Sequence, residues 1–321
     1  MKIYFYVLWI FTVQLSVGAD IYIDRKGQDS NSGSAEKPVR SLKKGQELVR
    51  ELIPSAKDDI TVHLGPGTWV VDEPIVFSTE DSGTSSFTVT WSGSDTIISG
   101  GYEVGNWTEG KDGIWSASVP EGTKSRNLYV NGLAAQYARR QIHNRTDFKH
   151  TKVGMTWNSS TYDWIMKVPG IENGELRAIN SFTDRIALIS KVGDHVLEMK
   201  KEIWANQLIG YDQIAEPFWD GGVWIQNVRA LLTVGGQFYL DRNQSTVYYK
   251  PLAGEDMATA SAHLGIQEVL MVVGGTYEEP VHDLLFKGIS FEHSTWLRPD
   301  TYGYIDQQTG GHMGNDSLAE L

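Results

Sequence analysis

Short runs of alternating apolar and polar residues recur along the first hundred residues of the chain and are separated by turns. Residues 60–64 alternate, and the Gly-Pro-Gly segment at 65–67 then turns the chain. Further apolar runs follow at residues 69–71, 74–77, 87–91 and 96–99. A period of two residues is typical of β-strands with one buried face. Because no helical segment separates these runs, they cannot form β-α-β units, and they predict a β-sandwich or a coil of stacked short strands.

One amphipathic helix is expected near the N-terminus, beginning at about Pro38 or Ser41 and ending at Leu52. Its apolar or small residues recur every three or four positions, as one buried helix face requires. That stripe consists of Leu42, Gly45, Leu48, Val49 and Leu52. Pro54 lies two residues after the expected end, where a proline commonly follows a helix. A short strand at residues 20–24 and a polar loop at 25–37 precede the helix.

Residues 101–265 differ from the preceding region because they contain hairpin signals, and they predict an inserted antiparallel β-rich domain. Asn131-Gly132 lies between two apolar runs, which is a strong signal for a two-residue type I′ hairpin turn. A second hairpin with a longer loop is expected over residues 238–249. Residues 202–204 and 224–232 are compatible with either a helix edge or a strand.

Short apolar runs like those of the N-terminal region recur at residues 269–273 and 284–291. We therefore predict an N-terminal cap and first coils over residues 20–100, the insert over 101–265, and a resumed coil with a polar tail over 266–321. We expect Leu285, Phe286, Ile289 and Phe291 to point inward on the last strand and to be partly open to water, so that the chain made alone is poorly soluble or oligomeric.

The first 19 residues predict a cleaved secretory signal peptide. Lys2 is followed by an apolar run over residues 3–17, and small residues then occupy positions suited to cleavage before Asp20. An N-terminal membrane anchor is the alternative, but a bilayer span needs about 20 apolar residues, and this run is shorter. We therefore expect a secreted, extracellular protein with no membrane association after cleavage.

The composition is that of a globular protein, with 40% hydrophobic and 21% charged residues among 321. The formal net charge of −12 argues against binding to the phosphate backbone of a nucleic acid. The chain contains no cysteine, which excludes disulfides, thiolate metal sites and a cysteine nucleophile. The eight histidines show no zinc-protease spacing, and we expect neither a metal nor another cofactor.

Several segments resemble secreted right-handed parallel β-helix proteins of the pectate-lyase-like superfamily. The segments that carry the resemblance are Ile21–Ile23 with Lys37-Pro38, residues 60–69 with Glu73-Pro74, Ile98-Ser-Gly-Gly101 with Trp107, Leu128-Tyr-Val-Asn-Gly132 with Ala138-Arg139, Phe238-Tyr-Leu-Asp241, and Leu285–His293 with Thr295-Trp296. The resemblance covers most of residues 20–310 and is weakest over 140–235.

The resemblance implies an all-β fold that starts as a right-handed parallel β-helix. The N-terminal helix would cap the coil, and the β-rich insert would project from an early turn. The superfamily includes glycoside hydrolases, polysaccharide lyases and uncharacterised secreted proteins. Its hydrolases usually carry their catalytic carboxylates on later coils, so the resemblance implies that this chain is the N-terminal part of a longer protein.

Glu292 and Asp306 are the candidate catalytic residues, since glycoside hydrolysis needs two carboxyl groups about 5–5.5 Å or about 6.5–9.5 Å apart. Aromatic and polar side chains between and beside them are of the kind that furnish a sugar site. These candidate substrate-binding residues are His293, Trp296, Tyr304 and Gln307. The alternative is that Glu292 and His293 end a strand and Asp306 lies in a solvated loop.

Three other features carry weaker signals. Asp24, Asp29 and Asn31 offer hard oxygen ligands for Ca²⁺, although a solvated loop is the simpler interpretation because the spacing is not that of an EF-hand. Arg126, Arg139 and other arginines suit either uronate contacts or ordinary salt bridges. Five N-glycosylation sequons are present, at Asn106, Asn144, Asn158, Asn243 and Asn315.

Two classes of function remain open. The first is part of a secreted carbohydrate-active β-helix protein, a glycoside hydrolase that acts on cell-wall polysaccharide, with its main catalytic coils beyond this chain. The second is a non-catalytic glycan-binding or structural module. A polysaccharide lyase fragment is a variant of the first and would show Ca²⁺ dependence and an unsaturated product. In each case the expected partner is a polysaccharide or oligosaccharide.

Overall fold

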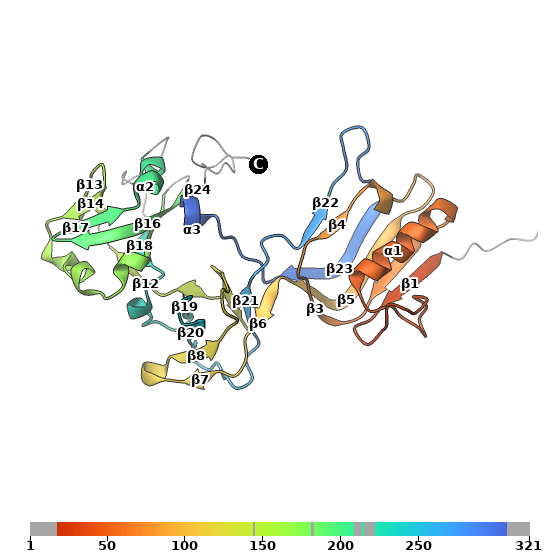
Figure 1. Ribbon diagram of the computed structural model, residues 1–321, viewed down its shortest axis with the longest axis horizontal. Helices are drawn as coiled ribbons and strands as arrows, with labels where there is room; N and C mark the ends of the chain where they lie inside the picture. The colour runs from red at the N-terminus through yellow and green to blue at the C-terminus, as the bar shows by residue number, and fades with distance from the viewer. Residues whose placement is uncertain (1–17, 144, 181–182, 209–213, 215–221, 307–321) are drawn as a thin grey trace, which may run out of the picture. The chain divides into compact units, whose positions relative to one another are not determined.

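The structure is a computed structural model that describes residues 18–143, 145–180, 183–208, 214 and 222–306 (Figure 1). The described chain divides into two compact units. Unit 1 comprises residues 18–99 and 269–292, and unit 2 comprises residues 100–268 and 293–306. Both consist mainly of β-strands, which confirms the prediction of a mostly β protein.

Unit 1 contains one α-helix and seven strands among its described residues. They are β1 (Ala19–Ile23), α1 (Leu42–Leu52), β2 (Ile60–Leu64), β3 (Gly67–Val70), β4 (Ile75–Phe77), β5 (Val89–Ser99), β22 (Met271–Val273) and β23 (Leu284–Glu292). Short 3₁₀ turns follow α1 and β4. The sheet follows the order β1-β2-β5-β23, and all of its strands run parallel.

The parallel register places apolar residues of neighbouring strands side by side across the sheet. Ile21 pairs with Val62, Val62 with Trp91, and Trp91 with Phe286. These side chains belong to the apolar core of unit 1, in which Val62 is fully buried and Trp91 is almost so. The period-two pattern of the sequence therefore produced the strands, and burial of one face set their register.

The sheet curls because β5 is longer than the strands beside it. Its first half pairs with β2, and its second half pairs with β3. The two predicted strands at 87–91 and 96–99 are thus one strand in the structure. Next to it, β23 shifts register at Gly288, which has φ of +66°, and a Cβ there would lie 2.2 Å from the Gly93 carbonyl oxygen. Glycine is required at this corner by both conformation and space.

Helix α1 forms where the sequence predicted it and covers apolar side chains of β1 and β2. Ser41 caps it by accepting a hydrogen bond from the Lys44 N–H at 3.0 Å. Arg50 in its last turn donates two hydrogen bonds of 2.8 Å to Asp81, whose side chain is buried. No helix among the described residues is long and apolar enough to cross a membrane.

Unit 2 is built mainly on antiparallel strand pairs, while β11 and β19 pair in parallel. Its strands and helices are β6 (Gly101–Glu103), β7 (Thr108–Glu109), β8 (Trp115–Ser118), β9 (Leu128–Val130), β10 (Leu133–Ala134), β11 (Gln136–Tyr137), β12 (Arg139–Ile142), β13 (Phe148–His150), β14 (Gly154–Trp157), β15 (Glu175–Ile179), β16 (Asp184–Gly193), β17 (Val196–Met199), α2 (Lys201–Gln207), β18 (Val223–Gln226), β19 (Gln237–Asp241), β20 (Thr246–Lys250), β21 (Ala262–Gly265), α3 (Pro299–Tyr302) and β24 (Tyr304–Asp306). The ambiguous segment at 202–204 is helical, whereas 224–232 forms a strand followed by a 3₁₀ turn.

The two predicted hairpins are present. Strands β9 and β10 are joined by Asn131 and Gly132, with φ of +50° and +78°, as a type I′ turn requires. Strands β19 and β20 form the second hairpin, with Phe238 opposite Tyr249. Both hairpins contribute to a core centred on Leu128, Val247 and Leu264.

The C-terminal region departs from the expected continuation of the coil. Residues 269–292 group with unit 1, but residues 293–306 group with unit 2 instead. The chain changes direction at His293, which has φ of +61°. The Thr295 N–H then donates to the Gln267 carbonyl, and β24 pairs with β16, so that backbone hydrogen bonds hold this stretch within unit 2.

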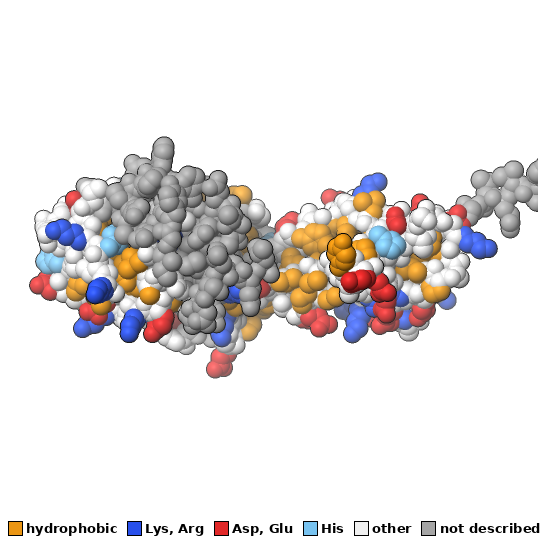
Figure 2. Space-filling model, turned by 90° about the horizontal axis from the view of Figure 1, so that it is seen from above, with side chains coloured by type: hydrophobic (Ala, Val, Ile, Leu, Met, Phe, Trp, Pro, Cys, Tyr) orange, Lys and Arg blue, Asp and Glu red, His pale blue; other side chains and the backbone are white. Residues whose placement is uncertain are grey.

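Strand β23 forms one edge of the parallel sheet and carries exposed apolar side chains. Leu285 is 49% exposed and Phe291 is 40% exposed. Leu285 faces away from the side that Phe286 shares with Trp91, so the expectation that it points inward was wrong. Figure 2 shows further hydrophobic side chains on the face of unit 1 where Figure 1 places β22 and the loop after it.

An exposed, apolar strand edge promotes self-association. We expect the protein from Asp20 onward to self-associate with increasing concentration, as measured by sedimentation velocity. Leu285→Lys should reduce this association, because a charge on an edge strand opposes further pairing. Val234→Lys is the matched control, since Val234 is an exposed valine of unit 2 and is not part of β23. A wild-type protein that stays monomeric at high concentration would contradict the expectation.

Gly132→Val tests the type I′ turn. No atom lies within 4 Å of a Cβ built at Gly132, so the cost would arise from the positive φ alone. We expect destabilisation of about 1–2 kcal/mol in urea unfolding. Gly105→Val, where a Cβ also meets open space but φ is not in the left-handed region, should be close to neutral. Equal effects of the two substitutions would contradict the turn assignment.

Candidate functional site

A pocket of about 490 Å³ opens in unit 2 where β11, β12, β15, β16 and β18 come together. Its wall is rich in cationic, amide and aromatic side chains. These are Arg126, Asn127, Gln136, Tyr137, Arg139, Arg177, Asp184, Gln226 and Trp296. All of them belong to unit 2.

Arg126 forms the base of this pocket and is 8% exposed. Its guanidinium donates two hydrogen bonds to Glu175, of 2.7 and 2.9 Å, and a third of 2.6 Å to Asp300. Gln226 donates to the same Glu175 carboxylate at 2.6 Å. Burial opposes the cation, but Glu175 and Asp300 outweigh it and raise the pKa of Arg126. A buried charge needs such pairing because its desolvation is costly.

Two more arginines reach the pocket with different partners. Arg177 donates two hydrogen bonds to Asp184, of 2.6 and 2.9 Å, and both side chains are about two-thirds to three-quarters buried. Arg139 instead lies over the Trp224 ring, 4.7 Å from its centroid. Burial and the nearby Arg177 cation lower the pKa of Arg139. No carboxylate among the described residues forms an ion pair with Arg139, which leaves this cation suited to a ligand.

Tyr137 places an aromatic ring on the pocket wall, stacked on Phe238 at 4.9 Å. The Arg126 guanidinium lies 5.3 Å from the centre of the Tyr137 ring. Burial raises the pKa of Tyr137 against the opposing effect of Arg126. Its hydroxyl is buried and has no hydrogen-bond partner within the described part of the chain. Such groups are uncommon in folded proteins, and water or a bound polar molecule would satisfy this one.

The predicted site residues that the structure describes do not come together in one site. Trp296 lines the pocket beside α3. Glu292 is half-buried at the end of β23 in unit 1 and does not line the pocket. His293 is 6% exposed and stacks on His263 at 4.0 Å, with Tyr129 against its edge. Burial and His263 lower the pKa of His293 to about 4, so it is neutral at pH 7. This position offers little surface to a sugar.

The remaining predicted residues lie near or beyond the limit of the described chain. Tyr304 and Asp306 belong to β24, whose backbone pairs with β16 so that Asp306 is opposite Asp184. The side chains of Tyr304 and Asp306, and the whole of Gln307, lie outside what the structure describes. Among the sequons, Asn106, Asn158 and Asn243 are exposed, while Asn144 and Asn315 are outside the described residues.

The acidic loop at residues 24–31 has clear structural roles. Asp29 accepts hydrogen bonds of 2.8 Å from the N–H groups of Arg40 and Ser41. Burial acts against the carboxylate, but these hydrogen bonds and the Arg40 charge prevail and lower the pKa of Asp29. Asp24 accepts from the Lys26 N–H, and Asn31 donates to the Pro38 carbonyl. These contacts hold the loop against the start of α1.

Sequence reasoning missed Arg177, Asp184 and Tyr137 as pocket residues, and Glu175 as the buried partner of Arg126. Glu175 and Arg177 lie two positions apart on β15 and therefore face the same side of the sheet. A fully buried glutamate at the start of an apolar strand is a signal for a buried ion pair. Its partner Arg126 lies 49 residues earlier, and no local pattern links the two.

Comparisons with known proteins concern the fold alone. No protein-family model and no curated protein matches this sequence. A solved structure titled "Glycoside hydrolase" matches with a TM-score of 0.80 and 23% identity, over 92% of this chain and 54% of that one. The chain thus spans about half the length of that protein. A second structure, "The complex structure of XylC with xylose", matches with a TM-score of 0.37 and 12% identity, over 86% of this chain and 35% of that one.

Glu175→Gln tests the ion-pair network beneath the pocket. Loss of the carboxylate charge leaves the buried Arg126 cation with Asp300 alone, and we expect destabilisation of about 3 kcal/mol. Asp184→Asn, in the more exposed pair with Arg177, should cost about 1 kcal/mol or less. Urea unfolding followed by tryptophan fluorescence measures both. Equal losses would show that Arg126 does not depend on Glu175.

Proposed function

We propose that this chain is part of a secreted, carbohydrate-active protein of the glycoside hydrolase type, and that the pocket in unit 2 binds a saccharide. The observation that carries the proposal is the match to a glycoside hydrolase over 92% of the chain at a TM-score of 0.80. The apolar run before Asp20 supports secretion, and a cell-wall polysaccharide is the expected substrate.

The right-handed parallel β-helix remains part of the proposal. The curled parallel sheet of unit 1, with β3 and β4 beside the main row of strands, supports it. In a β-helix each turn of chain stacks its strands on those of the previous turn, which is the relation of β5 to β2 and of β23 to β5. Helix α1 would then close the first turn.

The chemistry of the pocket supports a sugar ligand. Sugar rings present an apolar face that packs on aromatic side chains, and a rim of hydroxyl groups that needs donors and acceptors. Trp296 supplies aromatic surface, while Gln136, Gln226, Arg139 and the Tyr137 hydroxyl supply polar groups. Because Arg139 carries a positive charge without an acidic partner in the described chain, acceptor-rich or acidic sugars should bind best.

Non-catalytic saccharide binding is the second candidate function, and one observation favours it at this pocket. Three carboxylates at or beneath the pocket accept hydrogen bonds from arginine: Glu175 and Asp300 from Arg126, and Asp184 from Arg177. A general acid has to carry a proton that it can donate to the leaving group. A carboxylate engaged by a guanidinium is poorly suited to that role, whereas it positions the arginines for binding.

Binding and hydrolysis are tested together on the secreted protein. We expect retardation in affinity gels containing xylan or polygalacturonan. Trp296→Ala should weaken binding about tenfold, or ~1.4 kcal/mol, through loss of the aromatic contact. Tyr277→Ala is the matched control because Tyr277 is 97% exposed in unit 1.

The release of reducing sugar separates the two candidate functions, and an unsaturated product would indicate a lyase. Hydrolysis supports the enzyme, whereas binding without product supports the binding module. Equal binding by wild type and Trp296→Ala, or no binding to any of these glycans, would contradict the assignment of the pocket.

A further inference from the structure

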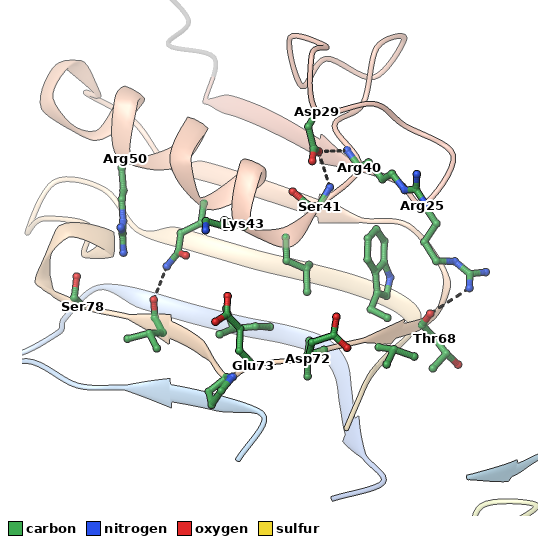
Figure 3. Close-up of a pocket in the computed structure, with 18 of the residues that line it drawn as sticks. Arg25, Asp29, Arg40, Ser41, Lys43, Arg50, Thr68, Asp72, Glu73 and Ser78 are labelled. Carbon is green, nitrogen blue, oxygen red and sulfur yellow. Dashed lines mark hydrogen bonds between the residues drawn. The ribbon is translucent and has the colours of Figure 1, made fainter. Parts of the chain in front are cut away.

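A second cavity, of about 990 Å³, lies in unit 1 between α1 and the strands β3 and β4 (Figure 3). Its floor is formed by aliphatic side chains, among which Val70 and Val76 are 55% and 52% exposed. Figure 3 shows α1 along one side of this groove and the β3–β4 segment along the other. None of the pocket residues discussed above belongs to it.

The backbone of β3 turns one edge toward this groove. The Val71 N–H donates to the Ser99 carbonyl, so the odd-numbered residues of this segment bond to β5. Alternate residues of a parallel strand direct their N–H and C=O groups to opposite sides. The Thr68 carbonyl accordingly accepts a 3.1 Å hydrogen bond from Arg25 across the groove. The backbone groups of Val70 point the same way.

Strand β4 shows the same arrangement. The Ile75 N–H donates to the Leu270 carbonyl on the side of β22. The Val76 carbonyl faces the opposite side, where it accepts a 2.7 Å hydrogen bond from the Gln46 side chain on α1. Side chains of Arg25 and Gln46 thus take two of the groove-facing carbonyls. No strand of the described chain pairs with this edge of β3 or β4.

The groove lies beside the edge of β3 that pairs with no described strand, at the position that a further strand of the same sheet would occupy. Strand β1 pairs with β2 and so fills the corresponding position in the neighbouring row. After Ile23 the chain turns, with the Gly27 N–H bonded to the Asp24 carbonyl, and leaves the sheet. The strand position beside β3 is therefore bordered by an edge on one side and by α1 on the other.

The lining favours a peptide over a sugar. Its one aromatic residue, Trp69, is 7% exposed, so no ring is available to stack on a sugar. A strand edge instead offers the main-chain hydrogen bonds through which extended peptides bind. Charges differ between the two ends of β3: Arg25 and Arg40 lie near Thr68 at its start, while Asp72 and Glu73 follow its end (Figure 3). Lys43 and Arg50 on α1, and Glu80, also line the groove.

We propose that this groove binds an extended peptide segment of another protein, which adds to β3 as a parallel strand. A parallel strand runs in the direction of β3, so acidic residues at its N-terminal end would meet Arg25 and Arg40. Basic residues at its C-terminal end would meet Asp72 and Glu73. Apolar residues at alternate positions between them would pack on the aliphatic floor.

The test uses the whole secreted protein and a fluorescein-labelled heptapeptide, Asp-Glu-Val-Thr-Val-Lys-Lys, followed by fluorescence anisotropy. The control peptide, Lys-Lys-Val-Thr-Val-Glu-Asp, has the same composition with its charges reversed along the strand. We expect saturable binding of the first peptide and at least about tenfold weaker binding of the second.

Two variants examine the strand edge and the charges separately. Val70→Pro removes an N–H that faces the groove and does not bond to β5, and edge strands tolerate proline. It should weaken binding at least about tenfold, whereas Val70→Thr should not. Arg40→Glu should weaken binding of the first peptide and strengthen binding of the control peptide. Because this variant leaves the strand edge intact, it still tests the proposal if Val70→Pro does not fold.

The proposal is overturned if the two peptides bind equally, if neither binds, or if Val70→Pro and Arg40→Glu both bind the first peptide as the wild type does. Displacement of the bound peptide by xylo-oligosaccharide would also overturn it, since the groove would then be a sugar site. These outcomes are independent of the pocket in unit 2, whose ligand is tested with Trp296→Ala.

Discussion

The buried guanidinium of Arg126 is the group on which the order of unit 2 around its pocket depends. The guanidinium joins Glu175 on β15 to Asp300 on α3, and the backbone N–H of Arg126 donates to the Thr295 hydroxyl. Stretches of chain before β9, within β15 and after β23 are thereby fixed to one another. Apolar residues of similar volume can stabilise a core as well as a buried ion pair does. We infer that the network is there to position polar groups, since Arg177, Gln226 and Trp296 surround the same cavity.

The two cavities differ in ways that follow from the strands that form them. The pocket of unit 2 is walled by strand faces, and side chains with charges and rings therefore decide what it binds. The groove of unit 1 borders a strand edge, so that main-chain groups of Thr68 and Val70 are part of its surface. Side chains discriminate sugars by stacking and directed hydrogen bonds, whereas a strand edge selects an extended chain.

Local features of the fold could be predicted because they depend on neighbouring residues. The alternation at Ile60–Leu64 produced β2, the stripe around Leu42 and Val49 produced α1, and Asn131-Gly132 produced its turn. The joining of residues 89–99 into one strand could not be predicted, because it depends on partners in β2, β3 and β23. The return of residues 293–306 to unit 2 depends likewise on contacts with distant segments.

The pocket was the least predictable part. Trp296 was expected near a sugar because aromatic residues gather around it in the sequence, and it does line the pocket. Arg177 and Asp184 were not expected there, nor was Glu175 expected beneath it, since their partners and neighbours come from segments far apart in the chain. The sequence marked Arg126 and Arg139 as basic residues. Only the fold shows that Arg126 is paired with Glu175, whereas Arg139 has no acidic partner in the described chain.

A crystal structure of the protein soaked with a short xylo- or galacturono-oligosaccharide tests the central claim most directly. We expect electron density for a sugar ring against Trp296, with one of its oxygens within hydrogen-bond distance of the Arg139 guanidinium. An empty pocket at saturating oligosaccharide, or sugar bound only at another place on the molecule, would contradict the assignment of a saccharide site to unit 2.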